Sequence, residues 1–311
     1  MENKILGIHH ITAVAGDVKK NLDFYSKVLG LRFIKKTVNF DDPGTYHFYF
    51  GDEAGSAGTI LTFFPWGAGI QSGRKGTGMA TEIGYSVPKG SLDFWLKRFQ
   101  DYNIIYNNPA EKFGQKYLTF LDPDGLKLEL TETENDSRKP WETDEVKAEH
   151  ATRGFHHITL TLKNIEATAA IITDIFEYKL IAKESNRYRY QTEAIADAAI
   201  IDLVELPAEN HGLSGGGIIH HVAFRVQNDE ILLHFREKIM NYGLQITPQI
   251  DRNYFHSLYF REPGGVLFEI ATDNPGFTVD EPLEELGKNL KLPAQYENRR
   301  SEIEAHLTPI N

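Results

Sequence analysis

The stretch "GIHHITAV" (Gly7–Val14) places two adjacent histidines at the start of a strand-like segment near the beginning of the chain. Related stretches recur as "GFHHITLTL" (Gly154–Leu162) and "GIIHHVAFRV" (Gly217–Val226). Each of these openings leads into an amphipathic helix and then into further strands. Self-similarity of this kind is typical of one supersecondary unit used several times.

The unit occurs four times. In the first, the helix is capped by Asp17 and ends at Gly30, and the strands "TYHFYFGD" and "GTILTFFP" follow. The second unit opens at "ATEIGYSVPKG" and has its helix at "SLDFWLKRFQDY"; the third and fourth have theirs near "IEATAAIITDIF" and "DEILLHFREKIMNYG". The closing segments "FLDPDGLKLEL" and "FREPGGVLFEI" align around a turn, which matches Glu129 with Glu269. Four βαβββ modules predict an α+β protein with mixed sheets.

The order of the modules divides the chain into segments. We expect a first pair of modules in residues 1–134 and a second pair in residues 154–274. Residues 135–153 are polar and charged without clear periodicity, so they are predicted to be the linker. Residues 275–311 fall outside the repeat and are predicted to be a C-terminal extension lying over the body.

Composition limits the possible functions. A net charge of -11 argues against a nucleic-acid partner and against anionic membrane surfaces. The absence of cysteine excludes disulfides, thiolate metal sites and a cysteine nucleophile. We find no signal-like or membrane-spanning apolar run and therefore expect a soluble, cytoplasmic protein, with self-association into a homo-oligomer left open. Any metal must then be held by imidazole and carboxylate groups.

Strand geometry selects one histidine of each pair, because neighbouring residues on a strand point to opposite faces. In the fourth unit, His221 lies on a small, polar face, whereas the histidine before it shares the apolar face. The same register selects His10 and His157. In the closing strand, Glu269 points away from its apolar neighbours, and a carboxylate there is costly unless it is paired or coordinated. A lone strand histidine is more often a hydrogen-bonded polar residue, but the repetition favours a metal site.

At this point the chain resembles a known family. The motifs "GIHHITA", "YHFYFGDEAGSAGTILTFFP", "GRKG", "VPKGSLDFW", "RGFHHIT", "GIIHHVAF" and "YFREPGGVLFEIAT" are similar to those of the vicinal oxygen chelate (glyoxalase/bleomycin resistance/extradiol dioxygenase) superfamily, and within it to bacterial hydroquinone-type ring-cleaving dioxygenases. The resemblance implies two domains of mixed sheets curved around a metal cavity. It also implies Fe(II), or less often Mn(II), held by His10, His221 and Glu269, with a small aromatic diol and O₂ as substrates. That set is a facial triad with open positions.

Three alternatives stay open. In a catechol-type extradiol dioxygenase, His157 would replace His10 as a ligand; we favour His10 because the hydroquinone-type motifs fall in units one and four. Another is a second, degenerate site of His157 with Glu129 or Glu82 between units two and three. The third is a glyoxalase-type lyase or isomerase, but the closing strand of unit one offers no fourth carboxylate, having Thr62 or Phe63 near the matching place. A binding protein that has lost its metal fits the retained ligands poorly. If units one and four supply the ligands, they must share one cavity, and units two and three must pair with each other.

Further side chains are candidates for catalysis. Tyr259 lies ten residues before Glu269 across the turn and could donate a proton, and Arg252 could hold an anion. The resemblance points to the same two residues, although a strand tyrosine commonly serves packing and a loop arginine is commonly solvated. His9 and His220 are expected on the opposite strand face as supports of the ligands or packed polar groups. Weaker candidates are His256 and, as an apolar wall for the ring, Phe63, Phe64 and Trp66.

Overall fold

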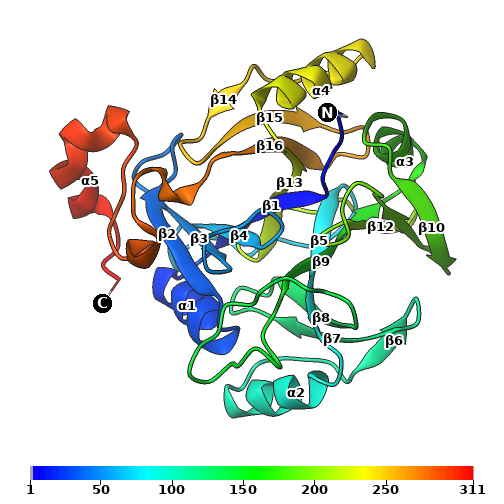
Figure 1. Ribbon diagram of the computed structural model, residues 1–311, viewed down its shortest axis with the longest axis horizontal. Helices are drawn as coiled ribbons and strands as arrows, with labels where there is room; N and C mark the ends of the chain where they lie inside the picture. The colour runs from blue at the N-terminus through cyan, green and yellow to red at the C-terminus, as the bar shows by residue number, and fades with distance from the viewer. Residues whose placement is uncertain (1–2, 311) are drawn as a thin grey trace.

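The computed structural model describes residues 3–310 and folds them into two eight-stranded mixed sheets with short helices around them (Figure 1). The first sheet contains, in spatial order, β14 (Ile250–Asp251), β15 (Phe255–Arg261), β16 (Leu267–Pro275), β13 (Ile218–Val226), β1 (Ile8–Ala15), β4 (Ile60–Pro65), β3 (Tyr46–Gly51) and β2 (Arg32–Val38). The second contains β10 (Lys179–Glu184), β11 (Arg187–Gln191), β12 (Ile200–Glu205), β9 (Gly154–Leu162), β5 (Met79–Pro88), β8 (Lys127–Thr133), β7 (Gln115–Leu121) and β6 (Ala110–Lys112). The predicted α+β class with mixed sheets is confirmed.

The sheets pair the modules in a nested order. Units one and four form the first sheet, and units two and three form the second. The expectation that units one and four share a cavity while units two and three pair with each other is therefore confirmed at the level of the sheets. Each half of the chain contributes strands to both sheets, so residues 1–134 and 154–274 describe the order along the chain rather than the sheets. The domain boundaries themselves stay a prediction.

The module-opening strands occupy the middle of each sheet. β1 pairs antiparallel with β13, and β5 pairs antiparallel with β9. Every residue of β1 and of β9 is buried, as expected of strands covered on both faces. The doubled histidines thus lie where two modules meet.

Short helices cover the outer faces of the sheets. They are α1 (Val18–Asp23), η1 (Phe24–Val28), α2 (Leu92–Asp101), α3 (Glu166–Ala170), η2 (Ile171–Ile175) and α4 (Asp229–Asn241). Asp17 accepts from the Lys20 amide, which confirms the predicted N-cap. The helices of units one and three are α-helical only in their first part and continue as π-helical turns, which the sequence did not predict. In the first, the Leu29 amide bonds the Phe24 carbonyl, and Gly30 then ends the helix at φ +69°.

The last segment packs against β2 at the edge of the first sheet and ends in a short helix. It contains η3 (Phe277–Val279), η4 (Leu283–Glu285), η5 (Ala294–Arg299) and α5 (Arg300–His306). The Lys35 ammonium of β2 is fully buried and bonds Asp280 at 2.6 Å and Glu281 at 2.5 Å. Among the residues described, no helix combines the length and apolar character needed to cross a membrane.

Candidate metal centre

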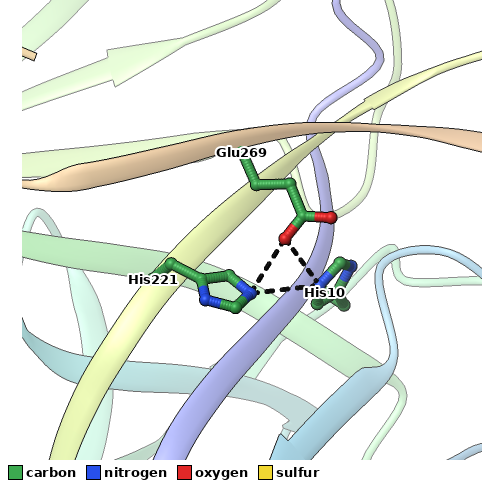
Figure 2. Close-up of side chains that lie close together, drawn as sticks. All are labelled: His10, His221 and Glu269. Atoms are coloured by element: carbon green, nitrogen blue, oxygen red, sulfur yellow. Dashed lines mark hydrogen bonds and ion pairs between the residues drawn. The ribbon is translucent and has the colours of Figure 1, made fainter. Parts of the chain in front are cut away.

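Three buried side chains from three adjacent strands converge in the first sheet: His10 of β1, His221 of β13 and Glu269 of β16 (Figure 2). The strand register brings them together. β13 lies between the other two strands, with His221 opposite Thr12 of β1 and Ala223 beside Glu269. The predicted ligand set is therefore placed in one cluster, although its metal-binding role stays a prediction.

The cluster fits a metal ion by geometry and by charge. His10 Nε2 lies 3.4 Å from His221 Nε2, and Glu269 Oε2 lies 3.2 Å and 2.9 Å from these two nitrogens. For ligands about 2.1 Å from an ion and at right angles, neighbouring donor atoms lie about 3 Å apart. Glu269 Oε2 is buried without a hydrogen bond, whereas Oε1 accepts from the Ser257 hydroxyl. An orphaned carboxylate oxygen between two imidazole nitrogens is well suited to a divalent cation.

Electrostatics keeps these groups ready to bind a cation. Burial opposes ionisation of Glu269, but the attraction of His10 and His221 outweighs it and holds the pKa of this carboxyl well below its ordinary value. Burial lowers the pKa of His221, although the nearby carboxylate partly compensates. An ionised carboxylate beside a neutral imidazole is the state that a metal requires.

The doubled histidines have a physical explanation. In each pair the two Nδ1 atoms are in hydrogen-bond contact, at 2.9 Å for His9 and His10 and 2.8 Å for His220 and His221. His9 Nε2 lies 3.1 Å from the Thr272 carbonyl and must donate to it, so His9 Nδ1 accepts from His10 Nδ1. His10 Nε2 then carries a lone pair directed at the cluster. The first histidine of the pair thus sets the tautomer and orientation of the second.

A cavity of about 210 Å³ opens beside the cluster. The cavity is lined by Tyr259, Arg252, Phe64 and Trp66. Tyr259 lies on β15, directly opposite Glu269 of β16. Arg252 Nε donates to the Tyr259 hydroxyl at 3.2 Å. Because an arginine can only donate, the phenolic proton stays available to another acceptor. Burial and the charge of Glu269 raise the pKa of Tyr259, so the phenol stays protonated at neutral pH.

Of the other predicted residues His220, His9, Phe63 and His256, only His220 lines the cavity. His220 lines the cavity and is exposed, although its strand parity predicted the opposite, apolar face. His9 lies behind His10, outside this cavity, and lines a neighbouring hollow with Tyr254 and Phe277. Phe63 packs against Tyr25 in the core rather than forming part of the wall. His256 bonds Asp229 at the start of α4, away from the cavity.

Several cavity residues escaped the sequence analysis. His47 and Tyr49 of β3 line the cavity, and the Tyr49 hydroxyl lies 2.9 Å from His47 Nδ1. His47 Nε2 contacts the Thr62 hydroxyl at 2.9 Å, and this hydroxyl bonds Thr12 at 2.8 Å. The alternation in "TYHFYFGD" places His47 and Tyr49 on one strand face and could have indicated them. Asn39, Phe40, Asp41 and Phe255 also line the cavity.

The register also locates a fourth ligand position. Thr62 lies beside Thr12, two residues after His10, just as Glu269 lies beside Ala223, two residues after His221. A hydroxyl engaged with two side chains therefore stands where a lyase-type site would need a carboxylate. Of the two residues named for the matching place, Thr62 occupies it and Phe63 does not, so the wall is polar at this point.

The alternative cluster of the second sheet also exists. Glu82, Glu129 and His157 converge there, all buried. Lys112 Nζ lies among them, 2.5 Å from Glu129 and 3.2 Å from Glu82. The two clusters differ in this internal cation.

Comparisons with known proteins agree with this architecture. The model of the Glyoxalase/Bleomycin resistance protein/Dioxygenase superfamily matches residues 7–130 and 154–270. The chain is 46% identical over 310 residues to the "Putative ring-cleaving dioxygenase MhqO" of Bacillus subtilis, covering 100% of this chain and 98% of that protein. It is 34% identical to the chlorohydroquinone/hydroquinone 1,2-dioxygenase of Sphingobium indicum, covering 97% and 96%. A crystal structure of a "putative dioxygenase" from Bacillus subtilis superposes with a TM-score of 0.95 at 46% identity, covering 99% and 98%.

Proposed function

Because this chain belongs to the Glyoxalase/Bleomycin resistance protein/Dioxygenase superfamily, we propose that it is a metal-dependent dioxygenase that opens the ring of a hydroquinone-like aromatic diol with O₂. Relatives that are 34% to 46% identical over nearly the whole chain are named as a putative ring-cleaving dioxygenase and as a chlorohydroquinone/hydroquinone dioxygenase. Ring-cleaving dioxygenase activity is the function that these relationships support. The observation that carries the proposal is the three-ligand cluster beside a small cavity, with Glu269 Oε2 left without a hydrogen bond.

His10, His221 and Glu269 would hold the ion. We propose Fe(II), with Mn(II) as the second choice, because two imidazoles and one carboxylate suit non-haem oxygenase metals and leave positions for substrate and O₂. When bound, the ion supplies a Lewis-acidic, redox-active centre at which O₂ and the diol meet. The polypeptide supplies orientation, exclusion of water and control of protons.

Tyr259 and Arg252 would handle the proton and the negative charge at the reacting oxygen. Arg252 holds the Tyr259 hydroxyl by a donated hydrogen bond, which leaves the phenolic proton free for a substrate oxygen. Arg252 also contacts Asp41 at 3.2 Å, which fixes the guanidinium from its other side. Burial of part of the ring and the adjacent His221 lower the pKa of His220 to about 4, so this partly exposed imidazole is neutral at pH 7; because its Nδ1 accepts from His221, its proton is on Nε2 and can be donated in a hydrogen bond.

The cavity favours a small, planar substrate. Its volume of about 210 Å³ lies below the roughly 300–1,000 Å³ of pockets for drug-sized ligands. Phe64 and Trp66 provide aromatic surface, while Asn39 and Asp41 provide polar groups. A single aromatic ring with a hydroxyl directed at the metal fits this division between apolar and polar lining.

Oxygen uptake tests the proposal. The protein would be reconstituted anaerobically with Fe(II) and then mixed with O₂ and either hydroquinones or catechols. We expect uptake with hydroquinones, accompanied by loss of the aromatic absorbance. Turnover of a thiol–aldehyde adduct without uptake for any diol would contradict ring cleavage.

Two matched variants test the ligand set. His10→Ala and His157→Ala each remove the second histidine of a pair, in the first and second sheet respectively. We expect His10→Ala to lose iron and activity and His157→Ala to retain both. The reverse pattern would support the catechol-type site instead.

A further inference from the structure

The two clusters occupy equivalent positions in the two sheets. The pairing of Glu269 with Ala223 and Tyr259 corresponds to that of Glu129 with Gly84 and Thr119. Likewise, His221 pairs with Thr12, and Glu82 pairs with Thr159. His10 and His157 each lie two residues before these threonines, so His157 corresponds to His10. The second cluster is therefore the counterpart of the metal centre, with a glutamate in place of one histidine.

The same register relates two cations. Ile250 pairs with Ser257 two residues before Tyr259, and Ala110 pairs with Tyr117 two residues before Thr119. Arg252 lies two residues after Ile250, and Lys112 lies two residues after Ala110. The two cations therefore occupy equivalent positions in the two sheets.

These two cations point to different partners. Arg252 contacts Tyr259 and Asp41 at the cavity, outside the three ligands. Lys112 Nζ instead donates to Glu129 at 2.5 Å and to Glu82 at 3.2 Å, and it lies 3.5 Å from His157 Nε2. Its ammonium group therefore lies where the donor atoms of the second cluster converge.

Cations already outnumber carboxylates around the second cluster. Lys127 also pairs with Glu82, while Arg187 and Arg189 pair with the neighbouring Asp202. The set holds three carboxylates, Glu82, Glu129 and Asp202, and four cations, Lys112, Lys127, Arg187 and Arg189. By contrast, Glu269 has no lysine or arginine partner among residues 3–310. A buried carboxylate without such a partner attracts a cation, whereas the compensated pair does not.

The hydrogen bonds also set His157 as a donor. Arg189 donates to the Gln115 oxygen at 2.9 Å, so the Gln115 amide nitrogen faces His156 Nε2 at 3.2 Å. His156 must accept there, and its Nδ1 therefore donates to His157 Nδ1 at 2.9 Å. His157 Nε2 then carries a proton toward Glu82, at 3.6 Å. This tautomer is opposite to that of His10, whose Nε2 lone pair faces the metal centre.

We propose that Lys112 is a built-in cation that takes the place of a divalent metal ion in the second pair of modules and so limits the chain to one ion. Removing the ammonium group leaves two buried carboxylates around a vacated position, and the His157 imidazole completes the ligand set when a metal ion displaces its Nε2 proton. Imidazole and carboxylate are ligands of divalent ions such as Mn(II), Fe(II) and Zn(II). The second cluster is a latent metal site that Lys112 keeps closed.

Metal stoichiometry tests this inference. Metal-free protein would be titrated with Mn(II), with the free ion followed by electron paramagnetic resonance and the bound ion by elemental analysis. We expect one ion per chain for the native sequence and two for Lys112→Ala. The second ion should disappear in Lys112→Ala/Glu129→Gln. Arg252→Ala is the matched control, because it removes the cation at the equivalent register, and it should not gain an ion.

A variant that keeps Lys112 makes the test independent of the folding of Lys112→Ala. We expect His10→Ala, with Lys112 in place, to bind no ion tightly. The inference would be overturned if His10→Ala retained an ion and His10→Ala/Glu129→Gln lost it. The metal would then have displaced Lys112 from the second cluster. A folded Lys112→Ala protein that binds one ion would also overturn it. If Lys112→Ala folds only with Mn(II), that dependence supports the latent site, and circular dichroism with and without the ion would detect it.

The inference rests on the metal-binding part of the proposed function but not on ring cleavage. Ion counts do not depend on turnover. A chain that binds one ion but consumes no O₂ with any diol would contradict the proposed function and leave the role of Lys112 intact.

Discussion

In each pair of histidines, one ring faces the cluster and the other orients it. The second ring offers Nε2 to the centre, and the first holds it through the Nδ1 contact. The partner of the first ring decides whether the second presents a lone pair or a proton. For His9 this partner is the Thr272 carbonyl, an acceptor, and for His156 it is the Gln115 amide, a donor. One backbone oxygen and one side-chain amide therefore give the two clusters opposite tautomers, in addition to the internal cation Lys112 that distinguishes them.

Tyr259→Phe removes the proton donor and keeps the ring. Because positioned acid–base groups contribute about 10²–10⁴-fold to rates, we expect kcat to fall by at least about 10²-fold. The metal content should stay at the native level, since Tyr259 is not one of the three converging ligands. Steady-state oxygen uptake and elemental analysis check both points. An unchanged kcat would show that the phenol serves only packing.

The candidate ligands were predictable from the sequence because they depend on local patterns. Strand parity and repetition selected His10, His157, His221 and Glu269, and the family resemblance singled out the three of them that the structure brings together in the first sheet. Alternation along β3 groups His47 with Tyr49 on one strand face, but which of the two faces meets the cavity depends on the pairing of β3 with β4, so His47 was not predicted. Lys112 was missed for the same reason, since it enters its cluster from an edge strand of the sheet.

At the scale of elements, two turn carboxylates connect the sheets. Asp122, in the Pro-Asp-Gly turn of unit two, accepts from the Tyr25 hydroxyl of unit one at 2.9 Å. Glu262, in the Pro-Gly-Gly turn of unit four, accepts from the Thr168 hydroxyl of unit three at 2.6 Å. Each carboxylate also accepts amide bonds within its own turn. The turns therefore hold a helix of the neighbouring sheet as well as joining two strands.

Asp122→Asn should change the pH dependence of stability. Burial raises the pKa of Asp122 from 3.8 to about 6 in the folded protein. The folded state therefore binds the proton more tightly than the unfolded state, so native stability falls as pH rises from about 4 to about 6 and is level above that. Asparagine does not titrate, so its stability relative to the native protein should rise by up to roughly 3 kcal/mol across this window, at about 1.4 kcal/mol per pKa unit.

Urea unfolding of both proteins between pH 4.5 and 7.5 would measure this difference, since the linear extrapolation gives a free energy at each pH. A difference that stays constant with pH would contradict the assignment. Asparagine can still accept the turn amides through its side-chain oxygen, so the variant is expected to fold.

Element types and order were predictable, but their internal register was not. The capping aspartate and the helix-ending glycine of unit one were recognised because their signals lie in adjacent residues. The π-helical turns of units one and three were not, because hydrophobic spacing alone does not distinguish hydrogen bonds to residue i−5 from those to i−4.

At the scale of the whole molecule, the C-terminal extension neutralises a buried charge. The Lys35 side chain is 0% exposed, and its carboxylate partners, Asp280 and Glu281, both come from the extension. Tyr254 of unit four also bonds Asp280, at 3.0 Å. The extension therefore links the two modules that contribute the candidate metal ligands.

Deleting residues 276–311 should leave Lys35 without these partners and strongly destabilise the protein. Breaking a buried ion pair costs about 3–5 kcal/mol. Lys35→Met should recover part of that loss in the truncated chain, whereas in the full chain the same substitution should be destabilising, because it leaves Glu281 unpaired. This reversal of sign, measured by urea unfolding, separates the effect of the charge from that of the apolar packing provided by the extension. Destabilisation by Lys35→Met in both chains would contradict the role given to the extension.

The nested order of the modules affects how the chain folds during synthesis. His10 and His221 are 211 residues apart in the sequence. The residues between them form the second sheet. At translation rates of about 5–20 residues per second, β1 waits roughly 10–40 s for β13. We expect the inner modules to fold first on the ribosome and the outer strands to stay accessible until late. Proteolysis of nascent chains stalled near residue 215 would reveal this order; protection of the first module at that length would contradict it. An ion held by His10, His221 and Glu269 could then be bound only after nearly the whole chain has been made.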